Sequence, residues 1–303
     1  MGKTPIFDIN NESIIGSGIY GDVKSANYTS RNITVAVKKI DLDNYFNSIR
    51  VNTAQKYTYI ERIKQRISEI KKLEGNNYQN IYFNKYIEET DEESNILYLG
   101  MEKCKTNLFK YLKERKINGG LDVGEIHEIL TQLNNTFQIM SNPNINIIHG
   151  NIKLENILVN TEGYRKIFKL TGFEIIPELV RLTKIYKQNK ICKYLPPELL
   201  GENNFTMDQK TDLWSLGVII YFLFFGEFPF NGQTCKNVKE EILKKQRKKT
   251  NFTELDDLID GLLEINKDQR LTWEKYFNHP FFKLNGFWRK YSKNKNGQTR
   301  TKN

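Results

Sequence analysis

The chain has 303 residues, of which 39% are hydrophobic and 27% charged, and its formal net charge is +10. This composition is typical of a globular protein with one large or two small domains and leaves ample apolar side chains for a core. It contains no run of about 18 apolar residues and no apolar signal stretch at its start, so we expect neither a transmembrane helix nor a secretory signal.

The three cysteines, Cys104, Cys192 and Cys235, are widely spaced and odd in number. This pattern argues against a disulfide framework or a metal site and fits a reducing compartment. We therefore expect an intracellular, cytoplasmic protein, with the nucleus as an alternative location.

Much of the positive charge lies in two segments. One covers residues 236–249, and the other is the tail at 283–303, which contains Lys and Arg but no acidic residue. A solvated helix or loop and a disordered tail are the ordinary explanation. The alternative is an acidic partner, either nucleic acid, an anionic membrane surface or an acidic protein segment. A basic tail does not choose among these partners.

The N-terminal third of the chain has the pattern of strands with one helix. Apolar residues alternate or run together between Gly and Asn breaks at 13–23, 33–40 and 96–101, which predicts strands. Residues 54–73 instead have helical spacing, and their apolar face is formed by Ile60, Ile63, Ile67 and Ile70.

After Thr106 the pattern becomes mostly helical. The predicted helices are 108–115, 124–140, 211–225, 252–263 and 271–277. The third of these is apolar on all sides, so we expect it to be buried. A strand-rich small lobe followed by a helix-rich large lobe is an α+β arrangement.

Two elements near the start indicate phosphate binding. Residues 16–23 form a Gly-x-Gly-x-x-Gly-x-Val element, and Val-Ala-Val-Lys follows at 35–38. Glycines let backbone N–H groups approach phosphate oxygens, and Lys38 at the end of the next strand could reach the same oxygens. Either element alone is weak, because a hairpin turn or an edge-strand charge gives the same pattern.

The most informative segment is His-Gly-Asn-Ile-Lys-Leu-Glu-Asn at 149–156. It resembles the catalytic loop of protein kinases, His-Arg-Asp-Leu-Lys-Pro-Glu-Asn. Together with the glycine element and Lys38, it makes the chain similar to a eukaryotic-type protein kinase domain over about residues 7–282. Lys153 is typical of the serine/threonine-type loop.

This resemblance implies a two-lobed, kinase-like α+β fold. Its parts would be a small β-rich N-lobe at 7–101, a hinge at 102–105, a larger helical C-lobe at 106–282 and, beyond the domain, the basic tail at 283–303. Further motifs support the fold rather than activity.

Among those motifs, Pro-Pro-Glu at 196–198 resembles the motif that closes the activation segment, and residues 212–218 resemble the buried helix that anchors the large lobe. In the family, the residues at Glu198 and Arg270 form a buried ion pair, and those at His149 and Phe173 belong to a regulatory stack of side chains.

The resemblance also implies a nucleotide site. Its positions would sandwich the adenine ring, bind it through the hinge backbone or contact phosphates, and they are Ile15, Gly16, Gly18, Gly21, Val23, Ala36, Lys38, Glu69, Met101, Glu102, Cys104 and Leu158. Glu69 is assigned as the partner of Lys38 because residues 69–73 match the small-lobe helix of kinases. A second register would place Arg66 there instead.

Both catalytic carboxylates of the family are missing. Asn151 stands where an Asp accepts the proton of the substrate hydroxyl, and an amide cannot act as that base. Gly172 stands where the Asp of Asp-Phe-Gly binds metal. Asn156, the other metal ligand, and Lys153 are present, but no catalytic set is intact. No metal is expected, and Asn156 would contact an ion only if one binds.

We therefore expect a pseudokinase of serine/threonine-kinase ancestry that acts as a scaffold or allosteric regulator. Its partner would be another protein, with an active kinase as one candidate, and ATP would be an optional ligand bound without magnesium. The alternative is a weakly active or atypical kinase that recruits Glu174 or Glu155 in place of the lost carboxylates.

Overall fold

The computed structural model describes residues 7–8, 13–18, 21–29, 32–48, 52–74, 87–91, 96–115, 120–173, 189–201 and 206–283. The chain forms two compact units. Unit 1 comprises Met1–Gln79 and Phe83–Lys105, and unit 2 comprises Asn80–Tyr82 and Thr106–Asn303. Glu174 and residues 284–303, which make up nearly all of the basic tail, lie outside the described residues.

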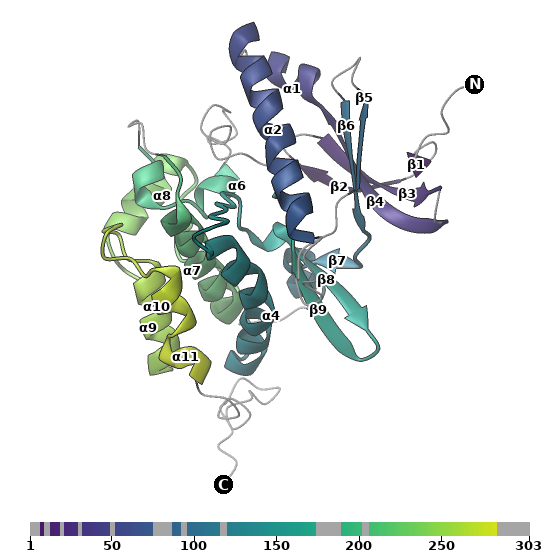
Figure 1. Cartoon of the computed structure of the whole chain (residues 1–303). Helices are drawn as coiled ribbons and strands as arrows, with labels where there is room; N and C mark the ends of the chain where they lie inside the picture. Colours follow the sequence, from purple (N-terminus) through teal and green to yellow (C-terminus); the bar gives the residue numbers. More distant parts are fainter. Residues whose placement is uncertain are drawn as a thin grey trace, which may run out of the picture. The chain divides into compact units, whose positions relative to one another are not determined.

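The described part of unit 1 contains an antiparallel sheet. Its strands are β1 (Phe7–Asp8), β2 (Ile14–Gly18), β3 (Gly21–Tyr28), β4 (Ile33–Asp41), β5 (Ile87–Asp91) and β6 (Ile96–Glu102). The strand order is β1-β3-β4-β6-β5, and β2 pairs with β3 (Figure 1). The strands predicted from alternation are confirmed, although the first predicted strand is a hairpin of β2 and β3.

Two helices belong to the described part of unit 1. The helix α2 (Thr53–Glu74) confirms the predicted helical segment, because Ile60, Ile63, Ile67 and Ile70 are all buried. The helix α1 (Leu42–Ser48) follows β4 directly and packs against β4 and β6. It was not predicted, because a helix of seven residues is too short to establish a period.

Unit 2 is mainly helical and carries one small sheet. The described helices are α3 (Leu108–Glu114), α4 (Val123–Ser141), η1 (Leu154–Asn156), α6 (Asn189–Cys192), η3 (Pro197–Leu199), α7 (Gln209–Phe225), α8 (Cys235–Leu243), α9 (Thr253–Leu262), α10 (Trp273–Phe277) and α11 (Pro280–Lys283). The sheet has the order β7 (Thr106–Asn107), β8 (Ile157–Glu162) and β9 (Arg165–Leu170).

The helix α7 lies in the core of unit 2, where it packs against α4 and α9 (Figure 1). Residues from Thr211 to Tyr221 are all buried, which confirms the prediction of a buried helix. The Asp208 side chain accepts a hydrogen bond from the backbone of Lys210 at the start of the helix, and Gly226 ends it in the left-handed conformation with φ 74°. These caps define where α7 begins and where it ends.

The expectation that the cysteines form no disulfide is wrong. Cys192 at the end of α6 and Cys235 at the start of α8 are joined by a disulfide, with their Cα atoms 5.3 Å apart. Cys104 is partly buried and takes no part in this disulfide. A spacing of 43 residues along the chain gives no signal for the pair, because tertiary packing of α6 against α8 brings the two cysteines together.

Within the described residues, no helix is both long enough and apolar enough to span a membrane.

Candidate functional site

The sheet of unit 1 places four candidate nucleotide-binding side chains on one face. Val23 on β3 lies opposite Lys38 on β4, and Ala36 on β4 lies opposite Met101 on β6. Residues directly opposite in an antiparallel pair share a face, and so do residues two apart along a strand. Val23, Ala36, Lys38 and Met101 therefore project from the same side. Gly16 joins them through its register with Val23.

Lys38 itself is buried, with 6% of its surface exposed. The residue opposite Lys38 on β6 is Leu99, which is fully buried. A charged amine this deep needs a compensating partner, since burying an unpaired charge is costly. A sheet position that holds a cation over an apolar face suits contact with an anionic ligand or carboxylate.

The glycine element has a structural role of its own. Gly18 pairs with Gly21 at the end of the β2–β3 ladder, and Gly21 has φ +144°. A β-carbon on Gly21 would lie 2.3 Å from the backbone oxygen of Lys39. Only glycine allows β3 to approach β4 this closely. Ile15 lies at the register shift between Ile14 and Gly16, and residues 19 and 20 lie outside the described residues.

The hinge candidates follow Met101. Glu102 is the last residue of β6, where it lies opposite Val35, and Cys104 is partly buried just beyond the strand. Between them, the Lys103 side chain turns back and its Nζ donates to Ser25 Oγ at 2.9 Å. Ser25 is opposite Ala36 and so belongs to the same face as Lys38. Lys103 is a neighbour of this face that the sequence did not indicate.

The helix α2 turns Arg66 inward and Glu69 outward. Arg66 is buried, with 8% exposure, whereas Glu69 is exposed and accepts a hydrogen bond from Gln65 Nε2 at 3.0 Å. The assignment of Glu69 as the partner of Lys38 stays a prediction, and so does the alternative register with Arg66. Positions three apart on a helix lie only about 60° apart around its axis, so helical spacing alone does not decide which of the two is buried.

In unit 2, the segment at 149–156 is anchored by hydrogen bonds to α7. The Asp212 carboxylate accepts the backbone N–H groups of His149 and Gly150, at 2.8 Å each. Gly150 has φ +69°, a conformation that favours glycine. Because the buried carboxylate satisfies both N–H groups, the loop backbone is fixed whichever side chains it carries.

His149 joins this loop to the end of β9. Its Nδ1 accepts the N–H of Asn151 at 3.2 Å, and its Nε2 lies 3.1 Å from the Thr171 carbonyl oxygen. Both bonds form when the proton is on Nε2. The ring also packs against Phe173, with centroids 4.6 Å apart. This ring contact is consistent with the assignment of His149 and Phe173 to one stack of side chains, whose regulatory role stays a prediction.

Asn156 lies directly beside Gly172. The Asn156 Nδ2 donates a hydrogen bond to the backbone oxygen of Asn151 at 2.8 Å. The backbone oxygen of Asn156 accepts the N–H of Thr171 at 2.9 Å. Gly172 is buried with φ +95°, and a β-carbon there would stand 2.8 Å from Asn156 Nδ2. The Asn156 Cγ and Oδ1 atoms lie 3.1 and 3.5 Å from the same point, so the whole side-chain amide packs against Gly172. Among the described residues no cluster of His, Cys, Asp or Glu could hold a metal ion.

The remaining loop residues are engaged elsewhere. Glu155 accepts the Tyr194 hydroxyl at 3.4 Å. Burial, helped by the Glu155 charge, raises the pKa of Tyr194 well above its ordinary value, so the hydroxyl stays neutral. Lys153 is partly buried just before η1, and Leu158 is partly buried on β8 opposite Lys169. Glu155 is thus held toward Tyr194 by its hydrogen bond.

The comparison with known families identifies the fold. A model of the protein kinase domain matches residues 9–282. The chain belongs to this family. Similar proteins include the serine/threonine-protein kinase atg1 of Dictyostelium discoideum, 27% identical, and the NUAK family SNF1-like kinase 1 of Homo sapiens, 26% identical, each covering 88–89% of this chain. The calcium-dependent protein kinase 5 of Plasmodium berghei (strain Anka) is 27% identical over 88% of the chain.

The chain spans less than half of the length of these relatives, 37–44%. The two-lobed α+β kinase fold predicted from the sequence is confirmed, with a β-sheet unit followed by a helical one. The resemblance to serine/threonine kinases is confirmed as well.

The kinase domain also has the predicted ion pair of Glu198 and Arg270. The Arg270 guanidinium donates to both carboxylate oxygens, at 2.8 and 3.0 Å, and its side chain is fully buried. It also donates to the backbone oxygens of Glu264 and Lys210 at 3.0 Å and lies over Trp214, 4.9 Å from the ring centroid. The buried cation is thus compensated by a carboxylate, two backbone oxygens and an aromatic ring, which stabilises η3 against the start of α7.

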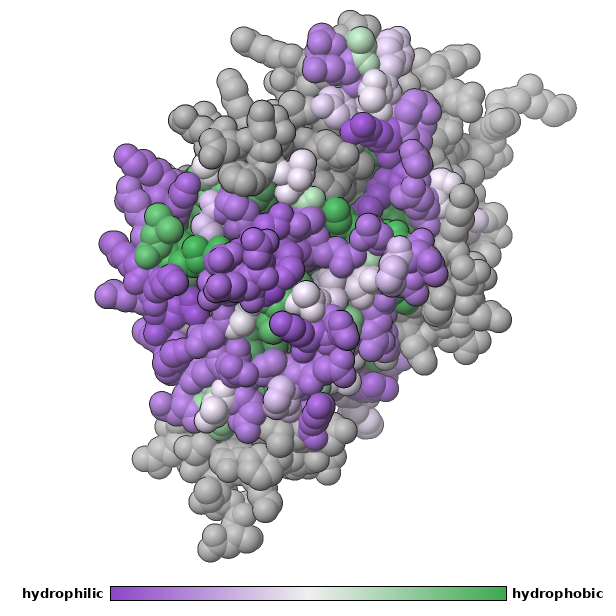
Figure 2. Space-filling model, turned by 60° about the vertical axis from the view of Figure 1, so that its left-hand side comes forward, coloured by the Kyte–Doolittle hydropathy of each residue, from purple (hydrophilic) through white to green (hydrophobic). Residues whose placement is uncertain are grey.

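The basic segment at 236–249 is partly neutralised in the kinase domain. Arg247 and Lys249 both contact Asp260, and Lys248 lies 2.5 Å from Glu227. Burial acts to raise the pKa of Asp260, but the hydrogen bonds from Lys249 and Arg247 outweigh it and the pKa is lowered. Figure 2 shows a largely hydrophilic face on which hydrophobic side chains form only small, separate areas. This face offers polar contacts rather than a broad apolar one.

Proposed function

We propose that this kinase domain is a pseudokinase that works by binding a protein partner. One observation carries the proposal: Gly172 and Asn151 stand where the chemistry of the family needs carboxylates, and the Asn156 amide fills the space beside Gly172. Losing a positioned base costs typically ~10²–10⁴ in rate. Metal charge stabilisation is worth several kcal/mol, and each ~1.4 kcal/mol is about tenfold. We expect phosphotransfer to be slower than in a typical kinase by about four decades or more.

Phosphotransfer tests this proposal directly. Purified protein would be incubated with radiolabelled ATP, magnesium and a generic basic substrate protein, beside a Lys38→Met variant. We expect the two proteins to give equal, background-level labelling. Robust labelling that disappears in Lys38→Met would overturn the proposal, because the signal would then come from this domain and not from a contaminating kinase.

ATP is proposed as an optional ligand that binds without magnesium. The residues fit a nucleotide, since Val23, Ala36 and Lys38 share one face of the sheet with Met101. They do not fit a magnesium ion, since Gly172 has no side-chain ligand. A thermal-shift titration with ATP in EDTA and in magnesium separates the cases. A ligand at about 100 times its dissociation constant adds ~2.7 kcal/mol of stability. Equal shifts in both buffers support metal-independent binding, whereas a shift that needs magnesium contradicts it.

A weakly active serine/threonine kinase is the second candidate, favoured by the names of the relatives. It would need another carboxylate, and the hydrogen bond from Tyr194 holds Glu155 away from that role. Glu174 is the remaining choice. This candidate predicts metal-dependent labelling that Glu174→Ala abolishes while Glu155→Gln retains it.

For the partner, an active kinase is our first candidate, and an acidic surface that meets the basic tail is a further proposal. Deleting residues 283–303 would then remove an affinity for acidic protein that falls steeply with salt. Affinity that is unchanged by the deletion and by salt would contradict a role for the tail.

A further inference from the structure

The segment that follows α6 is held by contacts on three sides. Lys193 Nζ donates to Asn231 Oδ1 at 2.6 Å, and the Tyr194 ring meets Phe228 edge to face at 5.3 Å. On the third side, Ser215 Oγ donates to the Tyr194 carbonyl at 2.8 Å. This segment lies just before the Pro-Pro-Glu motif, so these contacts determine how the end of the activation segment packs against the rest of unit 2.

A covalent bond adds to these contacts. The Cys192–Cys235 disulfide links α6 to α8, and its Cα separation of 5.3 Å falls within the range of about 4.4–6.8 Å for such bonds. The bond closes a loop of 43 residues that contains all of α7. Loops of this length lose much conformational freedom on cross-linking.

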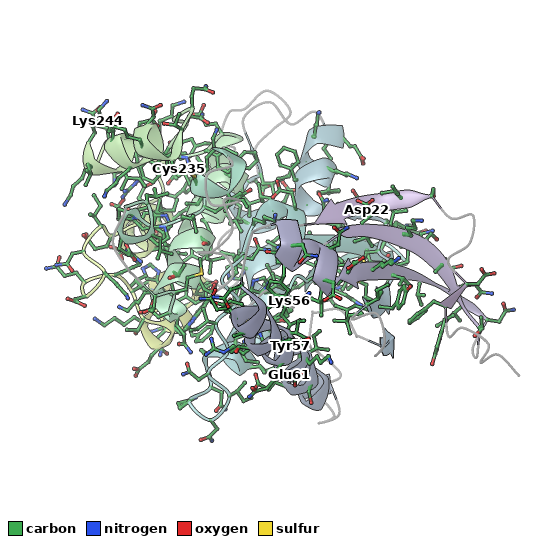
Figure 3. All side chains as sticks on the ribbon, turned by 90° about the horizontal axis from the view of Figure 1, so that it is seen from above. Asp22, Lys56, Tyr57, Glu61, Cys235 and Lys244 are labelled. Atoms are coloured by element: carbon green, nitrogen blue, oxygen red, sulfur yellow. A yellow bond between two sulfur atoms is a disulfide. The ribbon has the colours of Figure 1, made fainter. Side chains whose placement is uncertain are left out.

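The two sulfurs differ in access. Cys192 is fully buried, whereas Cys235 is partly exposed at the first turn of α8 (Figure 3). There it follows Thr234, whose hydroxyl accepts the backbone N–H of Asn237 at 3.1 Å, and it precedes Lys236. A helix N-terminus and a neighbouring cation both stabilise a thiolate. Small thiols and disulfides therefore react at Cys235 first.

We propose that Cys192 and Cys235 form a reversible redox clamp that locks the end of the activation segment onto α8. In the oxidising direction, the Cys235 thiolate attacks a small disulfide such as oxidised glutathione, forming a mixed disulfide and releasing one thiolate. The Cys192 thiolate then attacks the Cys235 sulfur and releases the second. The protein loses two electrons and two protons, and the small disulfide becomes two thiols. The reverse sequence, with a thiolate attacking Cys235, opens the clamp.

Differential alkylation across glutathione redox buffers tests the clamp. Protein equilibrated at each ratio of reduced to oxidised glutathione would be acid-quenched, alkylated under denaturing conditions and mapped by mass spectrometry. We expect the linked Cys192–Cys235 peptide to rise to near completion with oxidation and to disappear with reduction, while Cys104 is never linked to either. No linked peptide at any ratio, or a link that reduced glutathione never opens, overturns the proposal.

The order of attack is tested with single variants. Cys192→Ala should accumulate the glutathione adduct on Cys235, whereas Cys235→Ser should leave Cys192 largely unmodified because that thiol is buried. Cys235→Ser keeps the buried residue in place, so the comparison survives even if Cys192→Ala folds poorly. Faster modification of Cys192 in Cys235→Ser than of Cys235 in the wild type would contradict the assigned entry point.

Hydrogen exchange reports whether the bond restrains the segment. Amide exchange across residues 189–201 should be slower in the oxidised protein than in the reduced one, and Cys235→Ser should exchange like the reduced wild type in both buffers. Exchange in α4 and α9 serves as the internal reference. Equal exchange in oxidised and reduced wild type would show that the bond locks nothing, and the clamp would be rejected.

Discussion

The Asn156 side-chain nitrogen lies 2.8 Å from the point where a β-carbon would stand on Gly172. Asn156 cannot easily move away, because the same nitrogen donates to the Asn151 backbone oxygen. Asn151, Asn156 and Gly172 are thus packed together, with the Asn156 amide between the backbone of Asn151 and Gly172. We therefore expect a side chain at position 172 to disturb this packing.

Gly172→Ala should destabilise the domain more than Gly163→Ala. Both glycines have positive φ, +95° and +57°, but a β-carbon on Gly163 meets nothing within 4 Å. The left-handed backbone costs about 1–2 kcal/mol at each site. Crowding against Asn156 adds about 1–3 kcal/mol at Gly172 alone. Urea unfolding measures the difference, and adding Asn156→Ala should recover part of it. Equal losses for the two alanine variants would contradict the crowding.

Asp212→Ala should lower stability by at least about 3 kcal/mol, because hydrogen bonds to a charged group are worth about 1.5–3 kcal/mol each and two are lost. Asp212→Asn keeps one acceptor and should lose less. The matched control is Asp208→Ala on the same helix, which removes a cap worth about 1 kcal/mol. Chemical denaturation ranks the three variants. A loss for Asp212→Ala no larger than that of Asp208→Ala would mean that the loop is anchored elsewhere.

Arg270→Met should cost about 3–5 kcal/mol, because it leaves the Glu198 carboxylate without its buried partner. The double variant Arg270→Met with Glu198→Leu should lose clearly less than the sum of the single variants. A double-mutant cycle from thermal or urea unfolding gives this coupling. Additive losses would indicate that the two side chains contribute independently, contrary to the bidentate geometry.

Acidification below about pH 6.5 should destabilise the domain through His127. Its ring packs against Phe281 and Phe282, and burial lowers the pKa of His127, against a weaker opposing effect of the Phe282 backbone. The unfolded chain therefore binds the proton at higher pH than the folded one. Stability rises with pH through this window and falls as pH drops toward the folded-state pKa.

His127→Gln should flatten the pH dependence of unfolding between pH 7 and the folded-state pKa. His279 is the second histidine with a pKa lowered by burial, although Asp257 opposes that shift. His279→Gln is therefore the matched comparison, and the double variant should be the flattest. An unchanged slope in His127→Gln would show that His127 is not the titrating group.

Alternation and helical spacing predicted most of the elements correctly. The isoleucines of α2 repeat with the helical period because one face of that helix is buried, whereas α7 is apolar on all sides because it is buried all round. Short elements such as α1 escaped, since one or two turns contain too few residues to show a period. The charged run at 236–249 was expected to be a solvated helix or loop, but Arg247 and Lys248 have carboxylate partners in α9 and in the loop after α7, which the local sequence does not indicate.

The sequence by itself determined the family and which residue stands at each motif position, because motif spacing and residue type are local properties of the chain. Only the tertiary structure decided that Arg66 faces inward, that Asn156 fills the space at Gly172 and that Cys192 meets Cys235. Each of these depends on the distance between side chains from separate segments, and packing in three dimensions sets that distance.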